Sequence, residues 1–90
     1  MAIVIAHHRV KDFSAWKPFY DADISRRKNA GIHDWKVTTK KDDPNDVYMI
    51  WEVDDPEKLQ RMFSDPELKA IIDKAGVITH PEVVLLLDSR

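Results

Sequence analysis

The spacing of apolar residues divides the chain into short strands and helical segments. Four runs rich in β-branched, aliphatic or aromatic residues predict strands, at 2–9, 32–41, 47–54 and 82–88. Between them, apolar residues recur every three or four positions over 13–30 and 56–75, which predicts helices. The predicted order is β-α-β-β-α-β.

The first strand is apolar on both faces. Successive side chains of a strand point to opposite sides. One face therefore carries Val4, Ala6, His8 and Val10, and the other carries Ile3, Ile5, His7 and Arg9. Alternation separates the adjacent histidines, so they are not expected to ligate one metal ion together.

The first helix is expected to begin after Asp12 and to end before Gly31, a residue suited to a left-handed stop. Pro18 lacks a backbone donor, so we expect a kink or an irregular first turn. The stripe predicted to be buried consists of Phe13, Trp16, Phe19 or Tyr20, Ile24 and Arg27.

Two repeated start signals divide the second helical region. Aspartate followed by proline and glutamate combines an N-cap, a first-turn proline and an acid at the positive end of the helix dipole. This triplet occurs at 55–57 and again at 65–67. Two helices are therefore predicted, over 56–63 and 66–75, and Gly76 ends the second.

The strands at 32–41 and 47–54 are predicted to form a hairpin, because 42–46 has the composition of a turn. Lysines and threonines make the first of these strands polar, as expected at a sheet edge. The strands at 47–54 and 82–88 are apolar on both faces.

Together these elements predict a single α+β domain over 1–90. Its fold would be ferredoxin-like, with a four-stranded antiparallel sheet of order 4-1-3-2 and the helices on one face. The other sheet face would then be apolar and exposed. A homodimer whose sheets pack face to face would cover it.

Four stretches carry a resemblance to a known superfamily: HHRVKDFSAWKPFYD, DDPNDVYMIWEVDD, FSDPELKAIIDKAGV and PEVVLLLD. Together they resemble the dimeric α+β barrel superfamily, and most closely its antibiotic-biosynthesis-monooxygenase-like and cyclase-like small proteins. The resemblance spans nearly the whole chain and implies the fold, a homodimer and a ligand cavity between helices and sheet. Plant polyketide cyclases on this fold use a tyrosine and a histidine where Met62 and Leu68 stand here, which argues against the same cyclisation.

Composition excludes several classes of function. The 90 residues include no cysteine, so disulfides, thiol chemistry and cysteine-based metal sites are ruled out. A net charge of -2 gives no reason to expect nucleic acid or an anionic membrane as partner. No apolar run approaches membrane-spanning length and no signal peptide is recognised, so a cytoplasmic protein is expected. No flavin or nicotinamide fingerprint is present, and no cofactor is expected.

His8 is the main candidate for chemistry, because its strand face is expected beneath the helices. A neutral imidazole can act as a general base or orient a carbonyl or phenol. Asp23, if it reaches His8, would fix the tautomer of the imidazole. The predicted catalytic pair is thus His8 and Asp23, and the predicted substrate-binding residues are Tyr20, Arg27, Met49, Trp51, Met62 and Phe63.

Less specific interpretations of these residues remain open. His8 can be a half-exposed residue at a strand end, hydrogen-bonded to backbone. His7 can be an interface contact, a pH-sensitive element or an ordinary polar rim residue. Trp16 and Trp51 can be core rather than ligand contacts. A metal site of the two histidines with His80 and Glu82 has no characteristic spacing, so no metal is predicted.

Three functions compete at this point. The first is a cofactor-independent oxygenase or cyclase-like enzyme that acts on a small apolar, aromatic or phenolic compound, with His8 as base. The second is a non-catalytic dimer that binds such a ligand, for example in stress response. The third is an interaction module whose cavity is filled by side chains such as Trp51 and Phe63.

Overall fold

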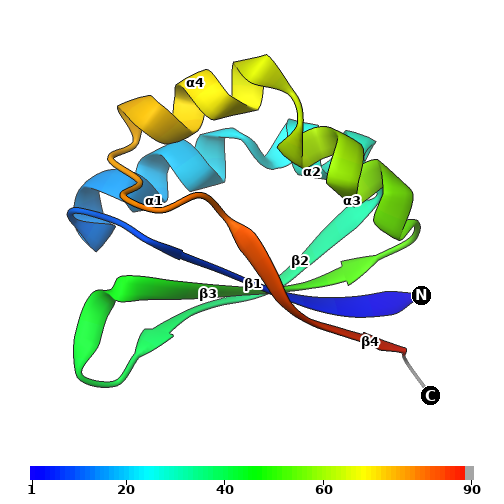
Figure 1. Cartoon of the computed structure of the whole chain (residues 1–90), viewed down its shortest axis with the longest axis horizontal. Coiled ribbons are helices and arrows are strands. Elements are labelled where there is room, and N and C mark those ends of the chain that lie inside the picture. Colours follow the sequence, from blue (N-terminus) through cyan, green and yellow to red (C-terminus); the bar gives the residue numbers. More distant parts are fainter. Residues whose placement is uncertain (89–90) are drawn as a thin grey trace.

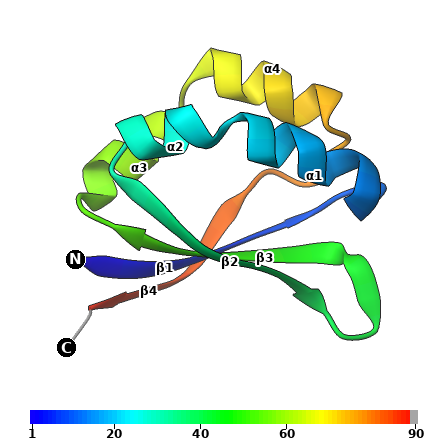
Figure 2. The ribbon, with the colours of Figure 1, turned by 180° about the vertical axis from the view of Figure 1, so that it is seen from behind.

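The structure is a computed structural model that describes residues 1–88. The elements in chain order are β1 (Ala2–Arg9), α1 (Phe13–Ala22), α2 (Ile24–Asn29), β2 (Ile32–Lys40), β3 (Asp43–Val53), α3 (Pro56–Phe63), α4 (Pro66–Lys74) and β4 (Glu82–Asp88). The four strands form one antiparallel sheet in the order β2-β3-β1-β4. All four helices lie on one face of this sheet (Figures 1 and 2). The predicted fold, strand order and helix placement are confirmed.

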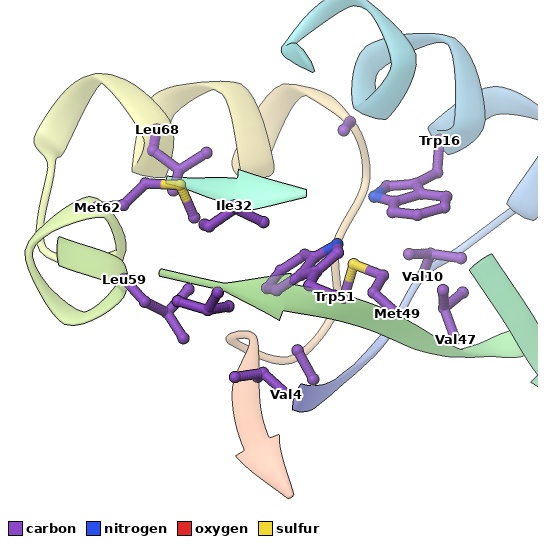
Figure 3. Close-up of a cluster of buried hydrophobic side chains, with 13 residues drawn as sticks. Val4, Val10, Trp16, Ile32, Val47, Met49, Trp51, Leu59, Met62 and Leu68 are labelled. Carbon is purple, nitrogen blue, oxygen red and sulfur yellow. The ribbon is translucent and has the colours of Figure 1, made fainter. Parts of the chain in front are cut away.

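The sheet register places the predicted face of β1 under the helices. Val4 pairs with Trp51, Ala6 with Met49 and His8 with Val47, and every one of these side chains is buried. Side chains of α1, α3 and α4 pack onto this face and complete the hydrophobic core (Figure 3). The core residues labelled in Figure 3 are Val4, Val10, Trp16, Ile32, Val47, Met49, Trp51, Leu59, Met62 and Leu68.

The helix caps follow the sequence signals. Asp12, Asp55 and Asp65 each accept a hydrogen bond from the backbone N–H two residues ahead, at the starts of α1, α3 and α4. Gly31 and Gly76 both have positive φ, as the predicted stops require. The Gly31 N–H bonds back to the Lys28 carbonyl at 3.0 Å, which ends the helical region before β2.

The first helical region is interrupted at Asp23, five residues beyond Pro18, so the predicted position of the irregularity was wrong. The carbonyl of Tyr20 shows how the interruption is accommodated. It accepts a hydrogen bond from the Asp23 N–H at 3.2 Å, three residues ahead, which tightens the last turn of α1. It also accepts one from Nη1 of Arg27 at 2.7 Å. A side chain of α2 thus satisfies a carbonyl at the end of α1. Ile24, predicted in the buried stripe, is the first residue of α2 and is 40% exposed.

The third strand begins earlier than predicted, at Asp43 instead of Val47. The turn shrinks to Lys41 and Asp42, and the stretch that reads as a turn pairs with β2 and β1. Asn45 explains the extension. Its carbonyl accepts from the Val10 N–H and its side-chain oxygen accepts from the Phe13 N–H, both at 2.9 Å. These bonds tie the start of β3 to the β1–α1 corner.

The last strand is an edge strand that the helices leave uncovered. Its apolar residues Val84, Leu85, Leu86 and Leu87 are each between 45% and 55% exposed. Leu85 and Leu87 pair with Ile5 and Ile3, so they belong to the sheet face that carries no helix. The predicted apolar outer face is present in the chain. Within residues 1–88, no helix combines the length and apolar character needed to span a membrane.

Candidate functional site

A cavity of about 60 Å³ lies between the helices and the sheet. Its lining is His8, Trp16, Phe19, Tyr20, Asp23, Arg27, Met49, Trp51, Met62, Phe63, Leu68, Ile71, Ile72, Ala75 and Pro81. This volume holds a few water molecules and falls short of the few hundred Å³ of a complete small-molecule site. A ligand larger than a few atoms would extend from the cavity into its mouth, where Phe19 is 41% exposed.

His8 is the most unusual residue of the lining. The side chain is 3% exposed, and neither ring nitrogen has a hydrogen-bond partner within residues 1–88. Its ring meets the ring of Trp16 edge-on, with centroids 5.0 Å apart. Burial, together with a smaller effect of the nearby His7, lowers the pKa of His8 to about 4, so the imidazole is neutral near pH 7. The half-exposed, backbone-bonded interpretation of His8 is therefore wrong.

Asp23 does not hold His8, contrary to the prediction. Both of its carboxylate oxygens accept from Nε of Arg26 at 3.2 Å. Arg26 also binds Asp65 at 2.5 Å and Glu67 at 3.0 Å, and thereby links α2 to the start of α4. The Arg26 side chain is 17% exposed.

Arg27 turns inward, as predicted, and is 4% exposed. Its Nε and Nη2 donate to the two carboxylate oxygens of Asp34 on β2, each at 2.9 Å. Its guanidinium also lies 3.7 Å from the centre of the Tyr20 ring. This arrangement is a bidentate ion pair beneath an aromatic ring. Asp34 balances the charge of Arg27, which lines the cavity.

The hydroxyl of Tyr20 belongs to the same network. It accepts from Nε1 of Trp51 at 2.8 Å and lies 3.4 Å from Oδ1 of Asp34, to which it donates. Burial raises the pKa of Tyr20 to about 12, so the phenol stays protonated near pH 7. Tyr20, Arg27 and Trp51 therefore hold one another in place, and their polar atoms already have partners.

Every predicted site residue lies on the lining of this cavity, although their roles stay predictions. The sequence interpretation omitted Asp34 and three contacts at the end of the chain's last helix, Ile71, Ile72 and Ala75. Spacing could have revealed the latter, because Leu68, Ile71, Ile72 and Ala75 recur at three and four positions. Asp34 had a subtler signal, since an arginine predicted to turn inward requires a nearby carboxylate. Trp51 and Phe63 contact each other, with ring centroids 6.2 Å apart, beside the cavity.

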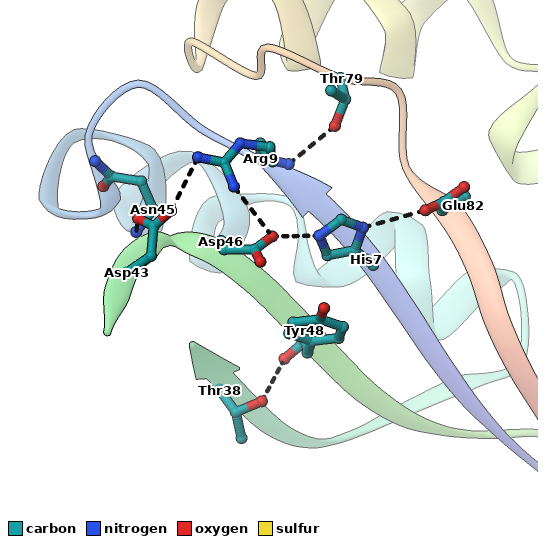
Figure 4. A network of polar contacts seen from close by, with 9 residues as sticks. All are labelled: His7, Arg9, Thr38, Asp43, Asn45, Asp46, Tyr48, Thr79 and Glu82. Atoms are coloured by element: carbon teal, nitrogen blue, oxygen red, sulfur yellow. Dashed lines mark hydrogen bonds and ion pairs between the residues drawn. The ribbon is translucent and has the colours of Figure 1, made fainter. Parts of the chain in front are cut away.

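On the opposite face of the sheet, His7 lies between two carboxylates (Figure 4). Nε2 contacts Asp46 and Nδ1 lies 3.2 Å from Glu82. Burial alone would lower the pKa of His7, but the hydrogen bonds and charges of Asp46 and Glu82 outweigh burial and raise it. Arg9 completes the cluster through Asp43 at 2.9 Å. Within residues 1–88, no three histidine or carboxylate side chains form a group suited to a metal ion.

No protein-family model matches the sequence, and no curated protein matches it either. Solved structures do match over the whole fold. A crystal structure of an antibiotic biosynthesis monooxygenase has a TM-score of 0.66 and 18% identity, covering 100% of this chain and 99% of that one. A NIPSNAP domain protein from Burkholderia xenovorans has a TM-score of 0.70 and 16% identity, covering 100% and 95%. A NIPSNAP family protein from Agrobacterium tumefaciens has a TM-score of 0.69 and 18% identity, covering 100% of this chain and 89% of that one.

These likenesses establish a shared fold. The chain has the ferredoxin-like architecture common to antibiotic-biosynthesis-monooxygenase-like and NIPSNAP proteins, as its sequence resemblance predicted. Since one fold can support many functions, the chemistry must be argued from the site of this chain itself.

Proposed function

We propose that the protein binds a small apolar compound, aromatic in character, in the cavity between helices and sheet, and that His8 is its hydrogen-bond partner. The single observation that carries this proposal is the isolation of His8. A buried polar side chain without a partner costs roughly 1–3 kcal/mol, and native proteins seldom retain one without a reason. A ligand that carries a hydroxyl or carbonyl group would supply the missing partner.

The aromatic character of the ligand follows from the walls of the cavity. Trp16, Tyr20, Trp51 and Phe63 all contribute rings, and Met49 and Met62 contribute polarisable thioethers. Offset and edge-to-face contacts with such rings favour a flat, unsaturated ligand. The enclosed volume would take its polar end beside His8, while the rest would lie at the mouth near Phe19.

Cofactor-independent oxygenation is the catalytic form of this proposal. One structural neighbour is named an antibiotic biosynthesis monooxygenase. In this chain, neutral His8 would accept the proton of a ligand hydroxyl, leaving an electron-rich anion that can react with dioxygen. With a pKa of about 4 in the empty cavity, His8 is a weak base. Proton transfer would therefore depend on the new anion, whose charge beside the imidazole raises that pKa.

Non-catalytic ligand binding is the second candidate, favoured by this same weak basicity. An imidazole that stays neutral near pH 7 is well suited to donate and accept hydrogen bonds without transferring a proton. A ligand carrier and an oxygenase would share the cavity and differ in turnover.

Ligand binding is tested by titrating the full-length protein with benzyl alcohol and following side-chain NMR signals. Saturable shifts are expected at the Trp16 indole and the Met49 methyl group, and they should weaken in His8→Leu. Ile24→Leu, which changes an exposed residue of α2, is the matched control and should bind normally. The absence of saturable shifts at millimolar benzyl alcohol would refute the binding proposal.

Catalysis is tested by oxygen uptake with a panel of hydroxylated aromatic compounds. An oxygenase would consume oxygen with at least one of them, and His8→Gln would lower the rate by roughly 10²–10⁴-fold if His8 is the base. Saturable binding without oxygen uptake would instead favour the carrier.

We also propose that a second copy of the chain covers the outer face of the sheet. This face carries Ile3 and Ile5 of β1, Ile50 of β3, and Leu85 and Leu87 of β4, with no helix over them (Figure 2). Leu85 is 47% exposed and Leu87 is 45% exposed. Two copies packed sheet to sheet would bury these residues, since opposed sheets interdigitate apolar side chains at a spacing of about 10 Å.

The dimer is tested by light scattering at micromolar concentration. The unaltered chain should have twice the monomer mass, and Ile5→Glu should shift it to the monomer, because a charge would be buried between the sheets. Ile24→Glu makes the same change on an exposed residue of α2 and should leave the mass unaltered. A monomeric unaltered chain would contradict the proposal.

A further inference from the structure

We infer that the cavity selects an uncharged ligand bearing one hydroxyl or carbonyl group, and that Asp34 sets this selectivity by neutralising Arg27. This inference rests on the proposed binding function and specifies the chemical class of the ligand. The charged side chains around the cavity each have a partner, whereas His8 has none within residues 1–88, and the inference follows from this difference.

Arg27 is the only cation that lines the cavity within residues 1–88, and it would ordinarily attract an anionic ligand. Asp34 prevents this because its two carboxylate oxygens accept hydrogen bonds from Nε and Nη2 of the guanidinium, each at 2.9 Å. The remaining Nη1 donates to the Tyr20 carbonyl at 2.7 Å, and the Tyr20 ring covers one face of the group. An entering carboxylate would have to displace Asp34, whose side chain is 31% exposed, from its pair with the buried Arg27.

Asp23 is the only carboxylate on the lining within residues 1–88, and it would ordinarily attract a cation. Arg26 holds both of its oxygens at 3.2 Å. Arg26 is itself fixed by Asp65 and Glu67 on the far side. A ligand ammonium group would therefore have to compete with Arg26 for both oxygens of Asp23.

His8 is then the polar group left for a ligand. A neutral imidazole offers one N–H donor and one bare nitrogen acceptor. A hydroxyl group can satisfy either nitrogen, and a carbonyl can satisfy the donor. A charged group would lose its hydration in this largely apolar cavity and gain no unpaired opposite charge, which is unfavourable.

Asp34 is a specificity-determining residue in this arrangement, although it is not part of the lining. It lies on β2, opposite Trp51 in the register, and reaches Arg27 from outside the cavity wall. Removing its negative charge while keeping its shape would leave the positive charge of Arg27 unbalanced beside the cavity. The cavity should then accept an anion.

The first experiment measures binding of four ligands that each contain a single benzene ring: toluene, benzyl alcohol, benzoate and benzylamine. They are titrated into the unaltered full-length protein at pH 7.5, where His8 is neutral and the last two ligands are charged. Benzyl alcohol should bind roughly fivefold more tightly than toluene, because its hydroxyl group adds one net hydrogen bond to His8. Benzoate and benzylamine should bind at least tenfold more weakly than benzyl alcohol.

The second experiment repeats the benzoate titration with Asp34→Asn. We expect at least a tenfold gain in benzoate affinity over the unaltered chain. Asp21→Asn is the matched control, because Asp21 is an exposed carboxylate paired with Lys17 on the outside of α1. It removes the same charge from the protein and should leave benzoate binding unchanged.

The outcomes separate the two proposals. If benzyl alcohol or toluene binds but benzoate binds equally well, the neutral-ligand inference is wrong and the binding function stands. If Asp34→Asn folds without gaining benzoate affinity, Asp34 does not set the selectivity. If Asp34→Asn does not fold, the four-ligand comparison on the unaltered chain decides the inference alone. If no ligand of the four binds, the proposed binding function itself fails.

Discussion

At the scale of single residues, two buried polar side chains that line the same cavity differ in their hydrogen bonding. Arg27 is hydrogen-bonded to Asp34 and Tyr20, whereas His8 has no partner at either nitrogen among the described residues 1–88. Both lie on faces that the sequence pattern marks as buried. A protein optimised for stability alone would pair both or replace both, so the isolation of His8 is a cost to the fold.

This cost predicts that His8→Leu stabilises the protein. Leucine has a similar volume and no polar atoms, so the free energy of unfolding should rise by about 1 kcal/mol as the unpaired nitrogens are removed. The same variant should no longer bind benzyl alcohol more tightly than toluene. A substitution that raises stability would thus remove a binding function, as is common at functional sites. Urea denaturation measures the first effect, and a decrease of more than 1 kcal/mol would show that His8 contributes favourable packing instead.

At the scale of elements, two glycines allow helices to end where the strands require it. Gly31 and Gly76 have φ values of +73° and +79°. Their surroundings differ, because a Cβ on Gly31 would lie 3.3 Å from the Asp54 side chain, whereas one on Gly76 would meet Lys11 at an ordinary 3.8 Å. Both positions disfavour other residues by conformation, and only Gly31 adds a steric contact.

Alanine substitutions at the two glycines separate the cost of the left-handed backbone from the cost of a steric contact. Gly76→Ala should lower the free energy of unfolding by about 1 kcal/mol, the cost of a left-handed alanine. Gly31→Ala should lower it further, because the tip of β3 next to Asp54 must also shift. Thermal unfolding of both variants measures the difference. Equal losses would mean that the Asp54 side chain moves aside freely.

At the scale of the whole molecule, the two adjacent histidines give opposite pH dependences on opposite faces of the sheet. The pKa of His8 is lowered from 6.5 to about 4 in the folded chain, so the unfolded chain binds its proton more readily. Its contribution is therefore complete above about pH 6.5 and is lost as the pH falls toward 4. The pKa of His7 is raised, so its contribution is complete below pH 6.5 and is lost as the pH rises through the folded value.

Urea denaturation across pH 4 to 9, at fixed protein concentration, tests this opposition. Between pH 6.5 and 4 the unaltered chain should lose roughly 3 kcal/mol more than His8→Leu does, because only the unaltered chain has to keep this imidazole uncharged. His7→Gln should remove part of the loss of stability on the alkaline side and leave the acid side intact. Parallel pH profiles for all three proteins would contradict these assignments.

The sequence alone determined the order of the strands and helical regions, the starts of α1, α3 and α4, the stops at Gly31 and Gly76, and the side of the sheet on which His8 and His7 lie. These features are local, because a two-residue period, an aspartate N-cap or a helix-ending glycine acts within a few residues of the chain. The same locality predicted that Arg27 turns inward and that α3 and α4 are separate helices.

Only the tertiary structure decided which polar groups meet. Asp23 was expected beside His8 and instead binds Arg26, and Asp34 was not expected at the site yet neutralises Arg27. The early start of β3 likewise depends on Asn45 reaching the β1–α1 corner. Each outcome is a choice among partners from different elements, settled by distances of a few ångströms that no periodicity encodes. The periodicity of the chain thus determined which residues face the cavity. The packing of the elements then left the His8 side chain without a hydrogen-bond partner within residues 1–88.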